Sequence, residues 1–269
     1  MKRKKLTASM IALVMSVSLP MTTYAANWYL EDGSVTVNAD NSGQTVTQGS
    51  TSTPDEAPVI TQRESSVETG NTITVNAAEN ATANVTISDV NIKTRNAAVS
   101  TNGKGNVNIE LDGTNTLKSR VDHAALEKNS DGNQGKLTIT DENENGKLIA
   151  TGGDGAAGIG GGLYAGGNDI TITGGEITAT GGDSGAGIGG GNHGNGRNIT
   201  ITDGEVTAAG GTNGAGIGGG LRKEGEKITV SGDATLKVQG GSGDGWDGAG
   251  AGIGNGGNPN GEISRSFIP

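Results

Sequence analysis

A repeat of 29 residues constrains this chain more than any other feature. Residues 169–191 read DITITGGEITATGGDSGAGIGGG, and residues 198–220 read NITITDGEVTAAGGTNGAGIGGG. Almost every residue of 169–191 is matched by an identical or similar residue 29 positions later. A unit of this length is too short to be a domain, so the repeat indicates a chain built from stacked copies of one small element.

Each unit contains three short stretches in which apolar residues recur. In the first stretch apolar and polar residues alternate, which is typical of a strand with one buried face. Glycine, asparagine and aspartate separate the stretches and indicate turns that need a positive φ angle. Six units align from residue 71 onward, and their apolar residues are Val85/Ile87, Val107/Ile109, Leu137/Ile139, Ile170/Ile172, Ile199/Ile201 and Ile228/Val230 in the first stretch, Ile92, Leu117, Leu148, Ile177, Val206 and Leu236 in the second, and Val99, Leu126, Ile159, Ile188, Ile217 and Ile253 in the third.

This pattern predicts an all-β fold for residues 71–269, a right-handed parallel β-helix, or β-solenoid, of about six coils with three short strands per coil. If each coil lies on the previous one at the strand spacing of about 4.8 Å, equivalent apolar residues form columns and the backbone pairs between coils. Right-handed connections are favoured between parallel strands. A disordered glycine-rich tract is the alternative, and the regular spacing of isoleucine argues against it.

The N-terminus has the pattern of a secretory signal peptide. Residues 2–5 are basic, an apolar run extends from Leu6 to Leu19, and Ala25 supplies a small residue at the cleavage position. We therefore predict that residues 1–25 are removed and that the protein is secreted, to the extracellular space or the bacterial cell surface. The apolar run is shorter than the roughly 20 residues of a membrane-spanning helix, so no membrane span is predicted.

The next segment, residues 26–70, has a polar, low-complexity composition with prolines at 54 and 58. Such composition predicts either a flexible linker or a loosely ordered N-terminal cap. Apolar residues at 28–30 and 35–37 indicate small capping strands.

Charge and residue content exclude several classes of protein. Without residues 1–25 the net charge is −14, the difference between 15 basic and 29 acidic residues. Such a surface repels nucleic acid and anionic lipid. The chain has no cysteine, so it forms no disulfides. His123 and His193 are far apart in the repeat, which gives no support to a transition-metal site or a catalytic triad.

The glycine motifs resemble those of a family of glycine-rich (GAGIGGG) repeat proteins of the bacterial surface. The residues that carry this resemblance are AGIGGG at 157–162, 186–191 and 215–220 and ITIT beginning at 170 and 199, and the resemblance covers about residues 27–263. It implies export, a pectate-lyase-like right-handed parallel β-helix, and an adhesin-like, carbohydrate-binding role toward an extracellular polysaccharide or a host glycan.

The chain departs from longer members of that family in having no evident cell-wall sorting motif or anchoring module. It stops near Glu262, Ile263 and Ser264, where another first strand is expected to begin, which is what a truncated frame would produce. An uncovered last coil exposes strand edges, so we expect self-association through the uncapped C-terminal coil.

Trp246 is the leading candidate for contact with carbohydrate. It lies between Asp244 and Asp247 in a longer excursion, residues 240–249. An exposed tryptophan can stack on a sugar ring while carboxylates accept hydrogen bonds from its hydroxyls or hold Ca²⁺. The alternative, which we favour at this point, is a tryptophan folded over the end of the solenoid as a hydrophobic cover. Tyr164, in a loop of the third unit, raises the same two alternatives.

Asp154 and Asp183 occupy equivalent positions in adjacent units. In stacked coils they would lie about 5 Å apart and could share a calcium ion. No other cofactor is expected. Polysaccharide lyase activity would also need a basic residue to remove a proton, and no basic column faces this pair. We therefore expect structural calcium or solvated turns here rather than catalysis.

Two other patterns arise from the repeat itself. Residues 185–190 and 214–219 match G-x-G-x-x-G, but no helical pattern follows either copy, so dinucleotide binding is not predicted. An outward threonine column resembles the flat arrays of ice-binding solenoids, although threonine is also an ordinary strand residue. This column contains Thr138, Thr171, Thr200 and Thr229, with Thr140, Thr173, Thr202 and Ser231 beside it.

The sequence thus predicts a surface carbohydrate-binding module and not an enzyme. The alternative is a passive structural stalk or spacer, favoured by the shortage of aromatic and basic residues. A polysaccharide lyase is a third class, and analogy with other proteins of the same fold is the only argument for it.

Overall fold

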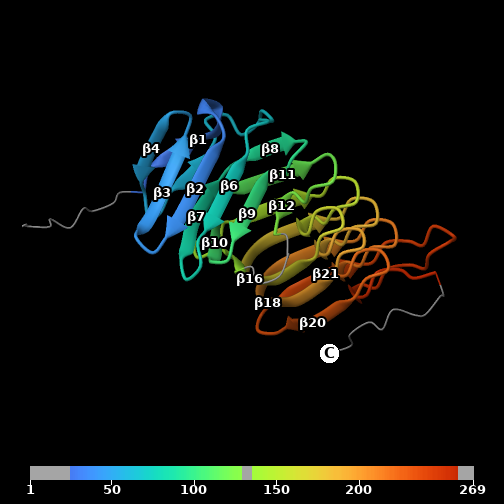
Figure 1. The fold of residues 1–269 in the computed structure, drawn as a ribbon. Helices are drawn as coiled ribbons and strands as arrows, with labels where there is room; N and C mark the ends of the chain where they lie inside the picture. Colours follow the sequence, from blue (N-terminus) through green and yellow to red (C-terminus); the bar gives the residue numbers. More distant parts are fainter. Residues whose placement is uncertain (1–24, 129–134, 260–269) are drawn as a thin grey trace, which may run out of the picture.

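Parallel pairing of strands with their equivalents in the next turn builds most of the described molecule (Figure 1). In the computed structural model, which describes residues 25–128 and 135–259, the chain is an all-β solenoid of about seven turns. The predicted parallel β-helix is therefore confirmed, with one turn more than the repeat indicates. The predicted signal peptide lies, apart from Ala25, outside the described residues.

Two sheets enclose the interior. One sheet has two rows of strands that meet at a bend. The first row contains β1 (Asn27–Tyr29), β5 (Val59–Thr61), β7 (Thr82–Ser88), β10 (Asn106–Asp112), β13 (Leu137–Thr140), the first halves of β16 (Gly167–Thr180) and β18 (Gly196–Ala209), and β20 (Gly225–Val230). The second row contains β8 (Asn91–Thr94), β11 (Thr114–Ser119), β14 (Lys147–Thr151), the second halves of β16 and β18, and β21 (Thr235–Gln239).

The other sheet supplies the third wall. Its parallel strands are β2 (Val35–Asp40), β6 (Ile73–Ala77), β9 (Val99–Gly103), β12 (Leu126–Glu127), β15 (Ile159–Gly160), β17 (Ile188–Gly189), β19 (Ile217–Gly218) and β22 (Ile253–Gly254). An antiparallel hairpin, β3 (Gly43–Gln48) and β4 (Thr51–Pro54), covers the edge of β2. A single 3-10 turn, η1 (Leu30–Asp32), follows β1, and no helix in the described part of the chain is long and apolar enough to cross a membrane.

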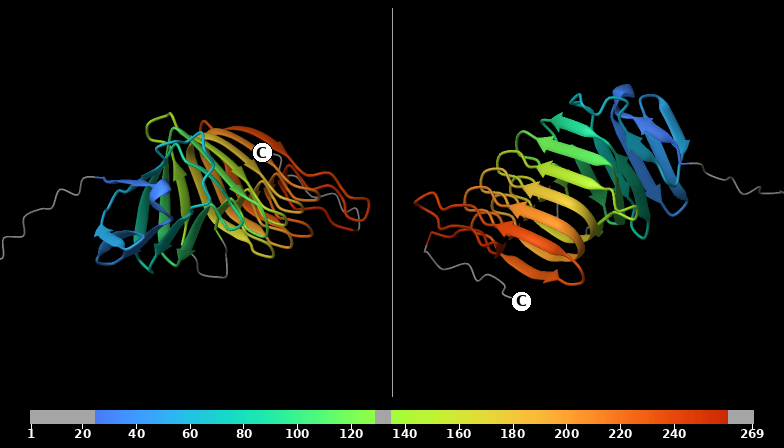
Figure 2. Two further views of the ribbon diagram at one scale, coloured as in Figure 1. Left: turned by 90° about the horizontal axis from the view of Figure 1, so that it is seen from above. Right: turned by 180° about the vertical axis from the view of Figure 1, so that it is seen from behind.

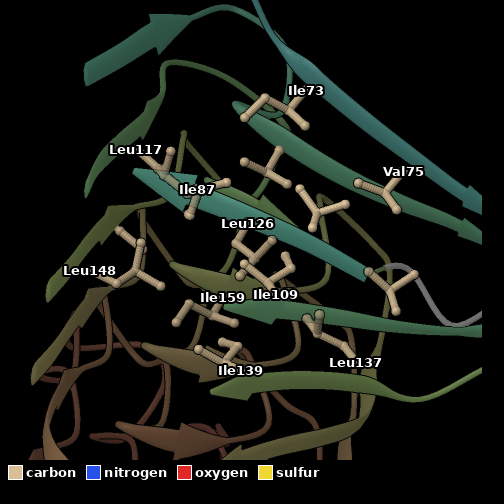
Figure 3. Packing of buried hydrophobic residues seen from close by; sticks show 14 of the residues in the cluster. Ile73, Val75, Ile87, Ile109, Leu117, Leu126, Leu137, Ile139, Leu148 and Ile159 are labelled. Atoms are coloured by element: carbon tan, nitrogen blue, oxygen red, sulfur yellow. The ribbon is translucent and has the colours of Figure 1, made fainter. Parts of the chain in front are cut away.

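The third apolar column forms as predicted. Its members pair in register from Val99 through Leu126, Ile159, Ile188 and Ile217 to Ile253. All are buried except Ile253, which is partly exposed in the last turn. Figure 3 shows the labelled members pointing into the interior beside those of the first sheet. Because burial of one such side chain contributes about 1.5–3 kcal/mol, the columns are the main stabilising feature of the stack.

The predicted register is wrong at one step in each of the other two columns, whereas the pairs Ile92–Leu117 and Val107–Leu137 hold. Val85 pairs with Ile109 instead of Val107, and Leu148 lies on Asn115 instead of Leu117. Strands β7 and β10 each place three apolar residues inward, so a shift of two positions preserves the buried face and the pattern alone does not fix the register. From β13 onward the predicted pairs hold.

Most of residues 26–70 is folded, with five strands and one 3-10 turn between Asn27 and Thr61. β1 pairs with β5, and β2 pairs with β6, so this segment continues the solenoid. The indole of Trp28 donates a hydrogen bond of 2.9 Å to the buried Asp55. Gln44 donates to the backbone oxygens of Asp55 and Asn84. The segment has few apolar residues because polar side chains that bond to the backbone hold it in place.

The later turns replace much of the third wall with glycine turns. Strands β15, β17, β19 and β22 are two residues long, and the turns on either side of each strand lie against each other. A Cβ atom on Gly182 would lie 1.8 Å from the carbonyl oxygen of Gly153 in the turn before, so the backbones touch directly. We call these turns the glycine-rich edge, and Figure 2 shows them stacked along one side of the solenoid; they comprise residues 152–158, 161–166, 181–187, 190–195, 210–216, 219–224, 240–252 and 255–258.

Candidate functional site

All six candidate site residues lie on the glycine-rich edge. The edge has two layers, one formed by turns that enter the short strands and one formed by turns that leave them. The layers are joined by backbone hydrogen bonds, from Asn192 to Gly155 at 2.8 Å and from Leu221 to Ser184 at 2.9 Å. The entering layer carries Asp154, Asp183, Asp244, Trp246 and Asp247, and the leaving layer carries Tyr164.

Asp154 and Asp183 lie in adjacent turns, as the repeat predicts. The amide of Gly155 donates to the carbonyl oxygen of Asp183 at 3.0 Å, and both aspartates are exposed. Within residues 25–128 and 135–259, no group of three or more His, Cys, Asp or Glu side chains could hold a metal ion. The equivalent residue of the next turn is Thr212, so the column offers this pair no third carboxylate. The geometry is that of two solvated turns.

Asp244 organises the loop that carries Trp246. One carboxylate oxygen accepts hydrogen bonds from the amides of Trp246, at 2.9 Å, and Asp247, at 2.8 Å. These backbone hydrogen bonds lower the pKa of Asp244, because they stabilise its ionised form. The loop therefore has a defined shape at neutral pH.

Asp247 anchors the same loop to the body of the solenoid. Its two oxygens accept from Nε and an Nη of Arg222, both at 2.9 Å, and the residue is only 6% exposed. The bond to Asp247 raises the pKa of Arg222. The buried Asn213 donates to the backbone oxygens of Asp247 and Gly248 at 3.1 and 3.0 Å. Both oxygens of Asp247 are thus used inside the protein, which leaves it a holding role rather than contact with sugar.

Trp246 itself projects into solvent. It is 86% exposed, so the prediction that it covers the end of the solenoid is wrong. Of the two alternatives for Trp246, an exposed side chain and a cover over the end of the solenoid, the structure shows the exposed side chain.

Tyr164 is also exposed, by 70%, and the column to which it belongs was missed by the sequence analysis. Its ring lies 6.0 Å from that of His193, with 59° between the planes. Tyr164, His193 and Arg222 follow one another at intervals of 29 residues. Applying the repeat length to Tyr164 would have found this column.

The outer face of the first sheet offers two polar grooves. One, of about 480 Å³, is lined mainly by outward residues such as Asn84, Asn108 and Thr138. The other, of about 570 Å³, lies at the bend between the two strand rows and is strongly acidic. Its acidic residues are Asp141, Glu142, Glu144, Glu176, Asp203 and Glu205.

The threonine column of this face is in register from Thr138 to Thr229. Its neighbour is interrupted, because Thr173 pairs with Asp203 across a bulge. The face is therefore not the flat two-column array that ice binding would need. Neither G-x-G-x-x-G match precedes a helix, since β17 and β19 lead into further turns.

A family model described as Beta helix repeat matches this chain. The matched residues are 144–163, 170–192 and 199–221, which are the turns with the glycine motif. The match agrees with the solenoid and concerns the fold alone. Neither the curated proteins nor the solved structures contain a significant match.

Proposed function

We propose that this protein is a secreted, adhesin-like carbohydrate-binding module of the bacterial surface and that it is not an enzyme. The observation that carries the proposal is Trp246, an indole 86% exposed on a loop whose shape is fixed by its own neighbours. Large aromatic side chains held in this way offer a flat apolar face on which a sugar ring can stack.

The length of the chain around Trp246 supports this role. Ile188 and Ile217 pair across one turn at the repeat distance of 29 residues, whereas Ile217 and Ile253 pair at a distance of 36. One of the seven extra residues lies between β20 and β21, and the other six lie in the excursion that carries Trp246. Stacking of the β-helix does not require them, because the turn before closes without them.

Charge around the loop favours binding over catalysis. Removal of a proton from an acidic sugar requires an available base, typically a lysine or arginine in a lyase-type site. Arg222 is the basic residue that contacts the Trp246 loop, and its guanidinium is engaged by Asp247. Export is supported by the signal pattern at residues 1–25.

A glycan array tests this proposal, with the mature chain compared with Trp246→Ala. We expect specific binding by the wild type, lost in Trp246→Ala, with no effect of a calcium chelator because the described residues give Asp154 and Asp183 no third carboxylate. Val67→Ala is the matched control, because it shortens another exposed apolar side chain, 58% exposed, in the N-terminal turns.

Absence of binding under all conditions would contradict the proposal and favour a passive spacer. Binding that survives Trp246→Ala would show that the site lies elsewhere, for instance in the groove lined by Asn84 and Asn108.

A further inference from the structure

Three residues of the glycine-rich edge form a row that ends at the loop carrying Trp246. Tyr164, His193 and Arg222 have the same place in successive turns, with φ angles of 62°, 57° and 58°. The amide of Tyr164 bonds to the carbonyl oxygen of Asn192 at 3.0 Å, and that of Arg222 bonds to Gly257 at 2.8 Å. The row therefore runs along the solenoid axis, in steps of about 4.8 Å.

Two residues of this row, Tyr164 and Arg222, are unusual for their backbone conformation. Left-handed φ favours glycine and, among the other residues, asparagine, aspartate and histidine, whereas other side chains meet steric strain there. The neighbouring left-handed rows obey this preference in large part, with Gly155, Ser184 and Asn213 in one row and Asp169, Asn198 and Lys227 in another. A chain so rich in glycine places tyrosine and arginine, both exposed, at two of the three left-handed positions of this row. Strain retained at a surface position indicates a function for the side chains.

The row is continuous with the Trp246 loop. Arg222, its last member, holds Asp247 through two hydrogen bonds, and Trp246 is the residue before Asp247. Tyr164 and His193 are in ring contact at the other end. Aromatic faces therefore lie at both ends of a strip that crosses at least three turns.

We propose that this strip, Tyr164, His193, Arg222 and Trp246, binds a neutral oligosaccharide chain laid along the solenoid axis. The inference rests on the proposed carbohydrate function and adds the direction, length and charge class of the ligand. Sugar rings stack on Tyr164 and Trp246, and the hydroxyls between them meet the polar edges of His193 and Arg222.

The charges around the strip select a neutral chain. Asp154, Asp183 and Asp244 are exposed on the entering layer of the same edge. The positive charge of Arg222 is matched by Asp247, so the strip offers little net attraction to an acidic sugar. Carboxylates accept hydrogen bonds from neutral hydroxyls and repel uronic acids.

The test is a length series on the secreted chain. Its probes are linear oligosaccharides of glucose, galactose, mannose, xylose and N-acetylglucosamine, each with two to six units, together with oligogalacturonates of the same lengths. We expect at least one neutral series to bind, with affinity rising at least tenfold from two to six units, and the oligogalacturonates to bind more weakly.

The variant Tyr164→Asn removes the ring but keeps a residue that accepts left-handed φ, and Tyr164→Phe keeps the ring. We expect Tyr164→Asn to abolish the gain in affinity from two to six units, and Tyr164→Phe to retain most of that gain. Trp246→Ala should weaken binding at every length.

The outcomes separate the two proposals. If no probe binds, or if binding is insensitive to Trp246→Ala, the proposed carbohydrate function of this edge fails. If binding depends on Trp246 but does not grow with chain length, or if Tyr164→Asn leaves the growth intact, the function stands and the axial strip is wrong. Stronger binding of oligogalacturonates overturns the assignment of a neutral ligand.

Discussion

The turns before and after residue 128 solve the same stacking problem differently. In the earlier turns the third wall begins with strands of five or six residues, β2, β6 and β9. Residues paired between adjacent turns there are separated by 24 to 38 positions, from 24 for Val85–Ile109 to 38 for Val35–Ile73. In the later turns that wall shrinks to two residues, and the separation is 29 positions from Ile159 to Ile188 and from Ile188 to Ile217.

This difference explains why the repeat length is strict only in the later turns. In the earlier turns side chains fill the space, so each turn can have its own length provided that its apolar residues reach the column. In the later turns backbone rests on backbone along the glycine-rich edge, so an inserted residue would displace the turns on both sides. The exception is the Trp246 excursion, which occurs in the last described turn, where nothing in the described residues stacks above it.

The largest expected effect comes from a charge in the third apolar column, which runs through both the earlier and the later turns. Ile188→Asp places an unpaired carboxylate in a position with no exposure, and we expect a loss of about 4–5 kcal/mol or more in the free energy of unfolding. Thermal denaturation followed by circular dichroism measures it, with Ile188→Val as a control that costs about 0.5–1.5 kcal/mol. A wild-type melting curve for Ile188→Asp would contradict the inward assignment.

Adding a methyl group to one glycine in each region tests directly whether the earlier and the later turns are packed differently. A Cβ on Gly185 would lie 2.1 Å from the carbonyl oxygen of Ala156, so Gly185→Ala is expected to cost about 3 kcal/mol. Gly70→Ala, in the earlier turns, meets nothing within 4 Å and is expected to be neutral or slightly stabilising. Equal melting temperatures for the two variants would show that the edge is not closely packed.

In the earlier turns the corresponding weak point is a polar residue. Asn115 is fully buried among the column residues, donates to the backbone oxygens of Asp112 and Lys147, and accepts from the amide of Val90. Asn115→Ala leaves these groups unpaired and is expected to cost about 1–2 kcal/mol in urea denaturation. The exposed Asn102, at the end of a surface ladder, is the control, and its alanine variant should change stability by less than about 0.5 kcal/mol. A neutral Asn115→Ala would mean that the register there does not depend on this side chain.

The smallest expected effect is a local acid transition in the Trp246 loop. Because the pKa of Asp244 is lowered in the folded loop, its contribution is present above the pKa of the unfolded chain, about 3.9, and is lost as the pH falls through the lower folded value. Tryptophan fluorescence anisotropy should therefore fall in acid below that range, while the buried Trp28 provides a constant background. Asp244→Asn retains an accepting oxygen that does not titrate, and the same transition in that variant would assign it to another group.

The same contrast explains how much could be predicted from sequence. The strict repeat of the later turns predicted the parallel stack, the isoleucine column and the equivalence of Asp154 and Asp183. It did not predict the order of residues 27–61, because that segment is held by polar contacts between distant residues, such as Gln44 with Asn84. Apolar patterning does not encode contacts of that kind.

The site was only partly predictable for a similar reason. Asp247 was one of the candidates for contact with a sugar, and no sequence pattern indicated that its carboxylate binds Arg222. The path of an irregular loop depends on such contacts, and the repeat does not predict them because the other described turns have no equivalent loop. The position of Tyr164 on the same edge as Trp246, in contrast, follows from the repeat once the turns are stacked.

Acrylamide quenching of tryptophan fluorescence, with and without a glycan identified on the array, tests the central claim most directly. The protein has two tryptophans, of which Trp28 is buried and Trp246 is exposed, so quenching of the free protein should be dominated by Trp246. We predict that saturating glycan protects this accessible component. Saturable glycan binding that leaves Trp246 equally open to acrylamide would contradict the claim that a sugar ring stacks on it.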